Sequence, residues 1–183
     1  MLSFANDGSG ERGSVVQVAH QIASRALIFV RWVKLLIRKA PLVVLHAEDE
    51  LADAHLVKTA VSANQITANL FQVSDGTEVL KFLREPDMRF AGAKRPDLIL
   101  LDLYMSGMDG RECLTVLKKD ENLRSIPVVI LSMSDAESDI VDCYALGASG
   151  YITKPVDVHQ YNMKIKHLFD YWIGLVRLPT NSY

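Results

Sequence analysis

From residue 41 onward, short apolar runs alternate with segments whose apolar residues recur every three or four positions. The runs are typical of buried strands, and the segments are typical of amphipathic helices. The pattern predicts five strands, at residues 42–47, 70–73, 98–101, 128–131 and 151–152. It predicts five helices that alternate with them, at residues 51–63, 77–83, 110–119, 138–146 and 158–176. This order predicts an α/β domain, a doubly wound five-stranded parallel sheet with helices on both faces.

Residues 15–39 have apolar side chains at helical spacing, opposite a polar face that carries Arg and Lys. They predict an amphipathic helix within a basic N-terminal extension, residues 1–40. The longest uninterrupted apolar run, residues 26–30, is far shorter than the ~18 residues of a membrane span. The helix either contacts a membrane surface or a partner, or packs on its own domain or a second copy, and we favour packing. A third interpretation is that the segment lies upstream of the true start.

Composition and charge support this division. The chain has 183 residues, of which 49% are hydrophobic and 23% charged, and this excludes a disordered chain. The net charge of −2 conceals six Lys and Arg against two acids in residues 1–40, and 14 against 20 in residues 41–183. Pro41 therefore marks the predicted boundary of a domain over residues 41–178, followed by a tail at residues 179–183.

The two cysteines and the charge balance limit the setting and the partners. Cys113 and Cys143 support neither a disulfide framework nor a closely spaced cysteine metal site, which indicates a reducing, cytoplasmic location. A near-neutral net charge does not suggest nucleic-acid binding. No helix-turn-helix or basic recognition segment follows the last predicted helix, so we expect no nucleic-acid partner.

Polar residues follow four of the five predicted strands, where the carboxyl ends of parallel strands form one edge. They are Glu48 and Asp49 after the first strand, Asp102 after the third, Ser132 after the fourth and Lys154 after the fifth. Crowded carboxylates repel one another unless a cation lies between them, and Mg²⁺ suits an oxygen ligand set. With Lys154, such a site has an acceptor carboxylate and cations for a phosphoryl group. Each residue alone is an ordinary turn residue, but together they favour a phosphoryl-accepting site.

Four segments have a recognisable sequence: HAEDE (46–50), PDLILLDLYMSGMDGREC (96–113), IPVVILSMSD (126–135) and GASGYITKPV (147–156). Together they resemble the response-regulator receiver domain of two-component signalling. The resemblance spans residues 41–178 and implies the flavodoxin-like form of the α/β fold. The polar insert before Pro96 and the ending DYWIGLVRLP (170–179) are most similar to single-domain receivers paired with bacterial phytochromes.

The resemblance also implies a role for each polar residue at the strand ends. Asp102 is the implied phosphoryl acceptor, and the implied Mg²⁺ ligands are Glu48, Asp49, Asp102 and the backbone carbonyl of Tyr104. Lys154 is implied to contact the phosphoryl group. The implied switch residues are Ser132, which moves to bond the phosphoryl group, and Tyr151, which then turns inward. A cis peptide bond is expected before Pro155.

The expected function is that of a single-domain response regulator, not a turnover enzyme. The resemblance implies that a sensor histidine kinase, such as a bacterial phytochrome, phosphorylates Asp102 with Mg²⁺ present, and that the surface of the fourth and fifth helices then changes its partner contacts. The last helix carries more apolar residues than one packing face needs, so we expect a homodimer contact at its end with residues 175–179. The alternative is a receiver that binds partners without phosphorylation. A dehalogenase-type phosphatase is discounted because Tyr104 stands where it requires a second acid.

One residue departs from the expected strand pattern. His46 occupies a position in the first strand that is normally aliphatic. Given its apolar neighbours, we expect a buried, hydrogen-bonded, neutral histidine rather than a ligand.

Overall fold

The computed structural model describes residues 40–84, 88–90 and 92–179. The helix predicted at residues 15–39 lies outside this part of the chain, as do residues 180–183. Within the described residues, no helix is both long enough and apolar enough to cross a membrane.

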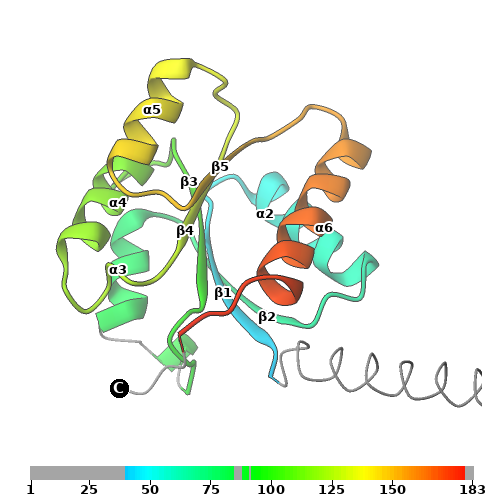
Figure 1. Cartoon of the computed structure of the whole chain (residues 1–183), viewed down its shortest axis with the longest axis horizontal. Coiled ribbons are helices and arrows are strands. Elements are labelled where there is room, and N and C mark those ends of the chain that lie inside the picture. The colour runs from blue at the N-terminus through cyan, green and yellow to red at the C-terminus, as the bar shows by residue number, and fades with distance from the viewer. Residues whose placement is uncertain (1–39, 85–87, 91, 180–183) are drawn as a thin grey trace, which may run out of the picture. The chain divides into compact units, whose positions relative to one another are not determined.

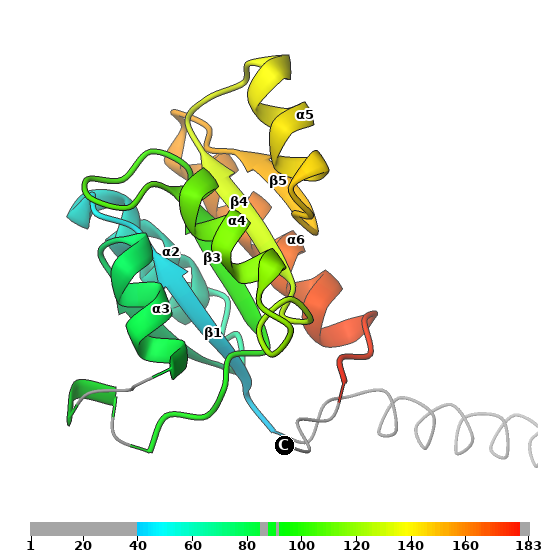
Figure 2. The ribbon, with the colours of Figure 1, turned by 90° about the vertical axis from the view of Figure 1, so that its left-hand side faces the viewer.

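Five parallel strands form one sheet in the order β2-β1-β3-β4-β5. They are β1 (Leu42–Ala47), β2 (Ala68–Val73), β3 (Leu98–Asp102), β4 (Val128–Ser132) and β5 (Gly150–Thr153). The strands β1, β3 and β4 are buried along their whole length, which explains their continuous apolar runs. Figure 2 shows the strands crossing the domain side by side between the helices.

The helices cover both faces of this sheet (Figure 1). One face packs against α3 (Gly76–Arg84), α4 (Gly110–Lys119) and α5 (Glu137–Ala145). The other face packs against α2 (Leu51–Ala63) and α6 (Val158–Gly174). Burial of apolar side chains in these two layers is the main driving force for the fold. The predicted doubly wound sheet, with helices on both faces, is confirmed.

The ends of several elements differ from the sequence prediction. The strand β2 starts at Ala68 rather than residue 70, because the edge position tolerates the polar Asn69. The helix α6 ends at Gly174 rather than residue 176. A short 3₁₀ helix, η1 (Met88–Phe90), lies in the polar stretch between α3 and β3, and the Phe90 ring contacts the Phe82 ring at a centroid distance of 4.8 Å.

The last helix buries most of its apolar residues against its own domain. Its buried side chains are Tyr161, Ile165, Leu168, Phe169 and Trp172. Val176 and Leu178, beyond the helix, are partly buried against the same core, whereas Leu175 is 78% exposed. The sheet therefore accounts for more of this apolar surface than the sequence suggests, and a homodimer contact at residues 175–179 stays a prediction.

Candidate functional site

Three carboxylates meet where β1 and β3 end. Glu48 and Asp49 follow β1 directly, and Asp102 is the last residue of β3. One oxygen of each lies within 4.8 Å of the others. Glu48 and Asp102 are buried, whereas Asp49 is partly exposed. Adjacent parallel strands thus place these acids together as the sequence predicts.

Within the part of the chain that the structure describes, one ammonium group lies against this acidic cluster. The Nζ atom of Lys154, the residue after β5, is 2.6 Å from Oε2 of Glu48 and 3.6 Å from Oδ1 of Asp102. It also donates a hydrogen bond of 2.8 Å to Oδ2 of Asp53, in the first turn of α2. The backbone N–H of Lys154 donates to the carbonyl of Ser132 at 2.7 Å, which fixes the start of the side chain at the edge of the sheet.

The burial of these charges shifts their proton affinities. Desolvation raises the pKa of Glu48 to about 7, although the hydrogen bond from Lys154 opposes the shift. Desolvation also raises the pKa of Asp102. Asp49 shows the reverse, because the backbone N–H of Ser106 donates to its carboxylate at 2.8 Å and lowers its pKa. Burial opposes the charge of Lys154, but hydrogen bonds to Asp53 and Glu48 outweigh burial and raise its pKa.

The donor set suits a divalent cation of the magnesium type. All three clustered side chains offer carboxylate oxygens, the ligands that hard cations prefer. Among the described residues, the three carboxylates of the cluster are paired with one ammonium group, that of Lys154, so the negative charge is in excess. A bound dication would supply the missing positive charge, so the residues present fit such an ion.

The two predicted switch residues are linked through the loop after β4. Ser132 is fully buried, and its hydroxyl oxygen accepts a hydrogen bond of 3.2 Å from the backbone N–H of Ser134. The phenol of Tyr151, in β5, donates to the carbonyl of Ser134 at 3.0 Å. A shift of Ser132 toward Asp102 would therefore disturb the same short loop that holds Tyr151.

A polar cluster beside the site is not evident from the sequence. The Oδ2 atom of Asp139, on α5, accepts hydrogen bonds from the phenol of Tyr104 at 2.6 Å and from the hydroxyl of Ser134 at 2.5 Å. The guanidinium of Arg111, on α4, pairs with the other oxygen of Asp139. These contacts tie the loops after β3 and β4 together. Their sequence separations are as large as 35 residues, so no local pattern reveals them.

The expected cis peptide bond before Pro155 is not found. Every peptide bond of the described residues is trans, including Lys154–Pro155. The trans isomer is the intrinsically favoured one, by roughly 0.5–1 kcal/mol even before proline. The expectation of a cis bond rested on the family resemblance alone, and it is wrong here.

His46 is buried as expected, but it is not hydrogen-bonded. Among the described residues, neither ring nitrogen has a hydrogen-bond partner, and the nearest carboxylate oxygen, from Glu48, is 4.0 Å from Nε2. Full burial, with the charge of Lys154 nearby, lowers the pKa of His46 from 6.5 to about 3. The neutral state agrees with the sequence prediction. The predicted hydrogen bond is wrong because the neighbouring strands use their own polar groups in the sheet.

Replacement of His46 by leucine should remove an acid sensitivity. The unfolded chain binds a proton at this ring below pH 6.5, whereas the folded chain stays neutral down to about pH 3. Wild-type stability should therefore fall as the pH drops through this window. Relative to His46→Leu, the wild type should lose about 2 kcal/mol of unfolding free energy between pH 7 and pH 5. Urea unfolding of both proteins measures this difference, and His55→Leu, on the exposed side of α2, is the control substitution. A difference that does not vary with pH would contradict the assignment.

With this geometry in place, comparison with known proteins identifies the class. The profile of the response regulator receiver domain matches residues 44–166, and the chain belongs to that family. Response regulator Rcp1 of Synechocystis sp. (strain ATCC 27184 / PCC 6803 / Kazusa) is 34% identical over 140 residues, which are 76% of this chain and 95% of Rcp1. A probable methanogenesis regulatory protein, FilR2 of Methanothrix harundinacea (strain 6Ac), is 32% identical, and the match covers 76% of this chain and 88% of FilR2.

Solved structures support the same assignment. The phosphorylated cyanobacterial phytochrome response regulator RcpA is 38% identical with a TM-score of 0.71, covering 77% of this chain and all of RcpA. The Mn²⁺-bound form of Rcp1 is 34% identical with a TM-score of 0.70, covering 76% of this chain and all of that structure. The chain is thus a receiver-domain protein related to phytochrome response regulators.

Proposed function

We propose that this chain is a phosphoryl-accepting response regulator, with Asp102 as the acceptor. The observation that carries this proposal is the position of the Asp102 carboxylate, which lies with Glu48 and Asp49 in one acidic cluster and 3.6 Å from the ammonium of Lys154. A nucleophilic carboxylate beside a fixed cation is the arrangement that phosphoryl transfer to an acid requires.

The transfer follows from the chemistry of the groups present. An oxygen of Asp102 attacks the phosphorus of a phosphohistidine on a sensor kinase, so that an O–P bond forms and the N–P bond breaks. The histidine nitrogen of the kinase leaves with the electron pair and takes up a proton. Lys154 stabilises the negative charge of the phosphoryl oxygens during the step. Because the chain accepts one group and holds it, it acts as a signalling intermediate and not as a turnover enzyme.

A magnesium ion would be held by the carboxylates of Glu48, Asp49 and Asp102, together with the backbone carbonyl of Tyr104. When bound, it supplies positive charge that screens the acceptor carboxylate from the incoming phosphoryl oxygens. The excess of carboxylates over ammonium groups among the described residues of the cluster supports this assignment.

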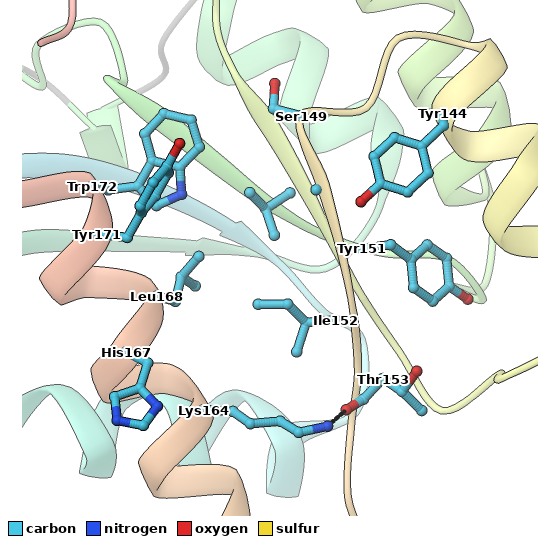
Figure 3. A pocket seen from close by; sticks show the side chains of 12 residues that line it. Tyr144, Ser149, Tyr151, Ile152, Thr153, Lys164, His167, Leu168, Tyr171 and Trp172 are labelled. Carbon is cyan, nitrogen blue, oxygen red and sulfur yellow. Dashed lines mark hydrogen bonds between the residues drawn. The ribbon is translucent and has the colours of Figure 1, made fainter. Parts of the chain in front are cut away.

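The signal would leave through the loop after β4 and the neighbouring helices. Ser132 bonds the new phosphoryl group, the loop at Ser134 shifts, and Tyr151 loses its present partner and turns inward. Tyr151 also lines a groove of about 580 Å³ between α5, β5 and α6. Figure 3 shows Tyr144, Tyr171 and Trp172 around the same groove. Rotation of Tyr151 would change the shape of this face, which we assign to partner contacts.

The partners follow from the relatives rather than from the fold. RcpA is a cyanobacterial phytochrome response regulator and is 38% identical to this chain, so we assign a phytochrome-type sensor kinase as the phosphoryl donor. A cytoplasmic setting, a second copy as partner of α6 and a separate basic extension before Pro41 belong to the same proposal.

The alternative is a receiver that binds partners without phosphorylation. Acetyl phosphate with Mg²⁺ separates the two, because it is a donor that requires no kinase. The proposed function predicts that wild-type protein gains one phosphoryl group and that Asp102→Asn gains none. A protein that gains no phosphoryl group would favour the alternative, and continuous release of phosphate would indicate a hydrolase.

A further inference from the structure

The Lys154 ammonium has a partner that the phosphorylation chemistry does not require. Asp53 lies in the first turn of α2, and its side chain is 27% exposed at the edge of the site. Its Oδ2 atom accepts a hydrogen bond of 2.8 Å from Nζ of Lys154, across 101 residues of sequence. An acid in the first turn of a helix is ordinarily explained by the helix dipole, but this one reaches a buried cation at the acceptor site.

The Lys154 ammonium lies closer to two neighbouring carboxylates than to the acceptor carboxylate. Nζ lies 2.6 Å from Glu48 and 2.8 Å from Asp53, but 3.6 Å from Asp102. Two of the three N–H donors of the ammonium are therefore committed to carboxylates other than the acceptor. The hydrogen-bond partners lie on the side of β1 and α2, and the acceptor carboxylate has only a longer Coulombic contact.

A phosphoryl group on Asp102 would need the same ammonium. Its oxygens carry negative charge, and a lysine that contacts them must move toward Asp102 and give up at least one present hydrogen bond. Divalent ion binding would engage Glu48, since it belongs to the acidic cluster. Asp53 lies outside that cluster, so its hydrogen bond with Lys154 would persist when the ion is bound.

We propose that Asp53 is a positioning residue that competes with the phosphoryl group for the Lys154 ammonium. The proposal rests on the proposed function. Asp53 holds Lys154 toward α2 in the resting protein, and it thereby weakens the pairing of Lys154 with the phosphorylated acceptor. In the resting state, the hydrogen bond to Asp53 fixes the position of the buried ammonium group. In the phosphorylated state, the weaker pairing with Lys154 makes loss of the phosphoryl group easier.

Binding of beryllofluoride, a stable analogue of a phosphoryl group on a carboxylate, tests this competition at equilibrium. In saturating Mg²⁺, followed by ¹⁹F NMR, Asp53→Asn should bind beryllofluoride about fivefold more tightly than wild type, because one charge-assisted competitor is removed. In the absence of beryllofluoride, the same variant should bind Mg²⁺ about threefold more weakly by calorimetry, since a nearby negative charge is lost and Lys154 is freed to pair with the metal ligands. Opposite signs for the two ligands are the signature of competition.

Two further variants keep the result specific. Asp53→Glu restores the carboxylate and should return both affinities toward wild type. Glu50→Gln removes the same charge from a neighbouring exposed position whose side chain caps α2 and does not bond Lys154, so it should leave beryllofluoride binding unchanged. Equal tightening by Glu50→Gln would overturn the competition in favour of a general charge effect. Weaker binding of both ligands by Asp53→Asn, with a lower melting temperature, would show that Asp53 is merely structural.

The test also separates this inference from the proposed function. If the wild type binds beryllofluoride and Asp53→Asn binds it equally well or less well, the competition is wrong and the acceptor role of Asp102 stands. If the wild type binds no beryllofluoride in Mg²⁺, both the acceptor role and the competition are overturned.

Discussion

Replacement of Lys154 by methionine should slow phosphorylation of Asp102 by about 100-fold or more, the usual cost of removing one preorganised group that stabilises charge in a transition state. The side chain is nearly fully buried, and its ammonium is 3.6 Å from the acceptor carboxylate. Methionine retains most of the side-chain volume but has no charge to offer the phosphoryl oxygens. Phosphorylation by acetyl phosphate in saturating Mg²⁺, followed by intact mass, measures the rate.

The same variant should bind Mg²⁺ more tightly, by about tenfold, because the ammonium no longer competes with the ion for Glu48 and Asp102. Loss of transfer together with a gain of metal affinity distinguishes a lost catalytic charge from a misfolded site. Lys166→Met removes a lysine from the exposed ion pair with Asp170 on α6, and it should alter neither property. Unchanged phosphorylation in Lys154→Met would contradict the role of this ammonium.

Replacement of Gly110 by alanine should destabilise the domain strongly. Gly110 begins α4 against the end of β3, and its N–H donates to the carbonyl of Leu103 at 3.0 Å. A Cβ atom at this position would lie 2.1 Å from the carbonyl oxygen of Asp102 and 2.8 Å from Cα of Leu103. Both clashing atoms belong to the backbone, so the clash can be relieved only by a backbone shift that displaces the acceptor residue. We expect a loss of about 3 kcal/mol of unfolding free energy, measured by urea denaturation.

Gly174 provides the matched control for this substitution. It ends α6, it is exposed, and a Cβ atom there would meet nothing within 4 Å. Gly174→Ala should therefore raise the unfolding free energy by about 0.5 kcal/mol through the higher helix propensity of alanine. A Gly110→Ala protein as stable as Gly174→Ala would show that the junction of β3 and α4 is not as tightly packed as the structure indicates.

The acidic cluster could be predicted from the sequence because parallel topology brings strand ends together. Once residues 42–47 and 98–101 are recognised as buried strands, Glu48, Asp49 and Asp102 must lie at one edge of the sheet. The position of Lys154 after β5, at the same edge of the sheet, follows in the same way. The four receiver motifs then specified the family, which the comparisons confirm.

Features that depend on side-chain packing between distant elements could not be predicted. Asp53 belongs to a helix whose periodic pattern gives no sign of a partner 101 residues away. His46 was expected to find a hydrogen bond, but the fully buried strand β1 leaves no polar neighbour within reach of its ring. Sequence patterns report which residues are buried, and they do not report the pairs that burial creates.

The decisive measurement for Asp102 as the acceptor is the location of the phosphoryl group. Wild-type protein and Asp102→Asn are treated with acetyl phosphate, with Mg²⁺ and with a chelator, and are then reduced with borohydride and digested for peptide mass mapping. We expect one phosphoryl group per wild-type chain, located on Asp102, dependent on the divalent ion and absent from Asp102→Asn. Absence of any modification in the wild type, or a phosphoryl group that persists in Asp102→Asn, would contradict this role of Asp102.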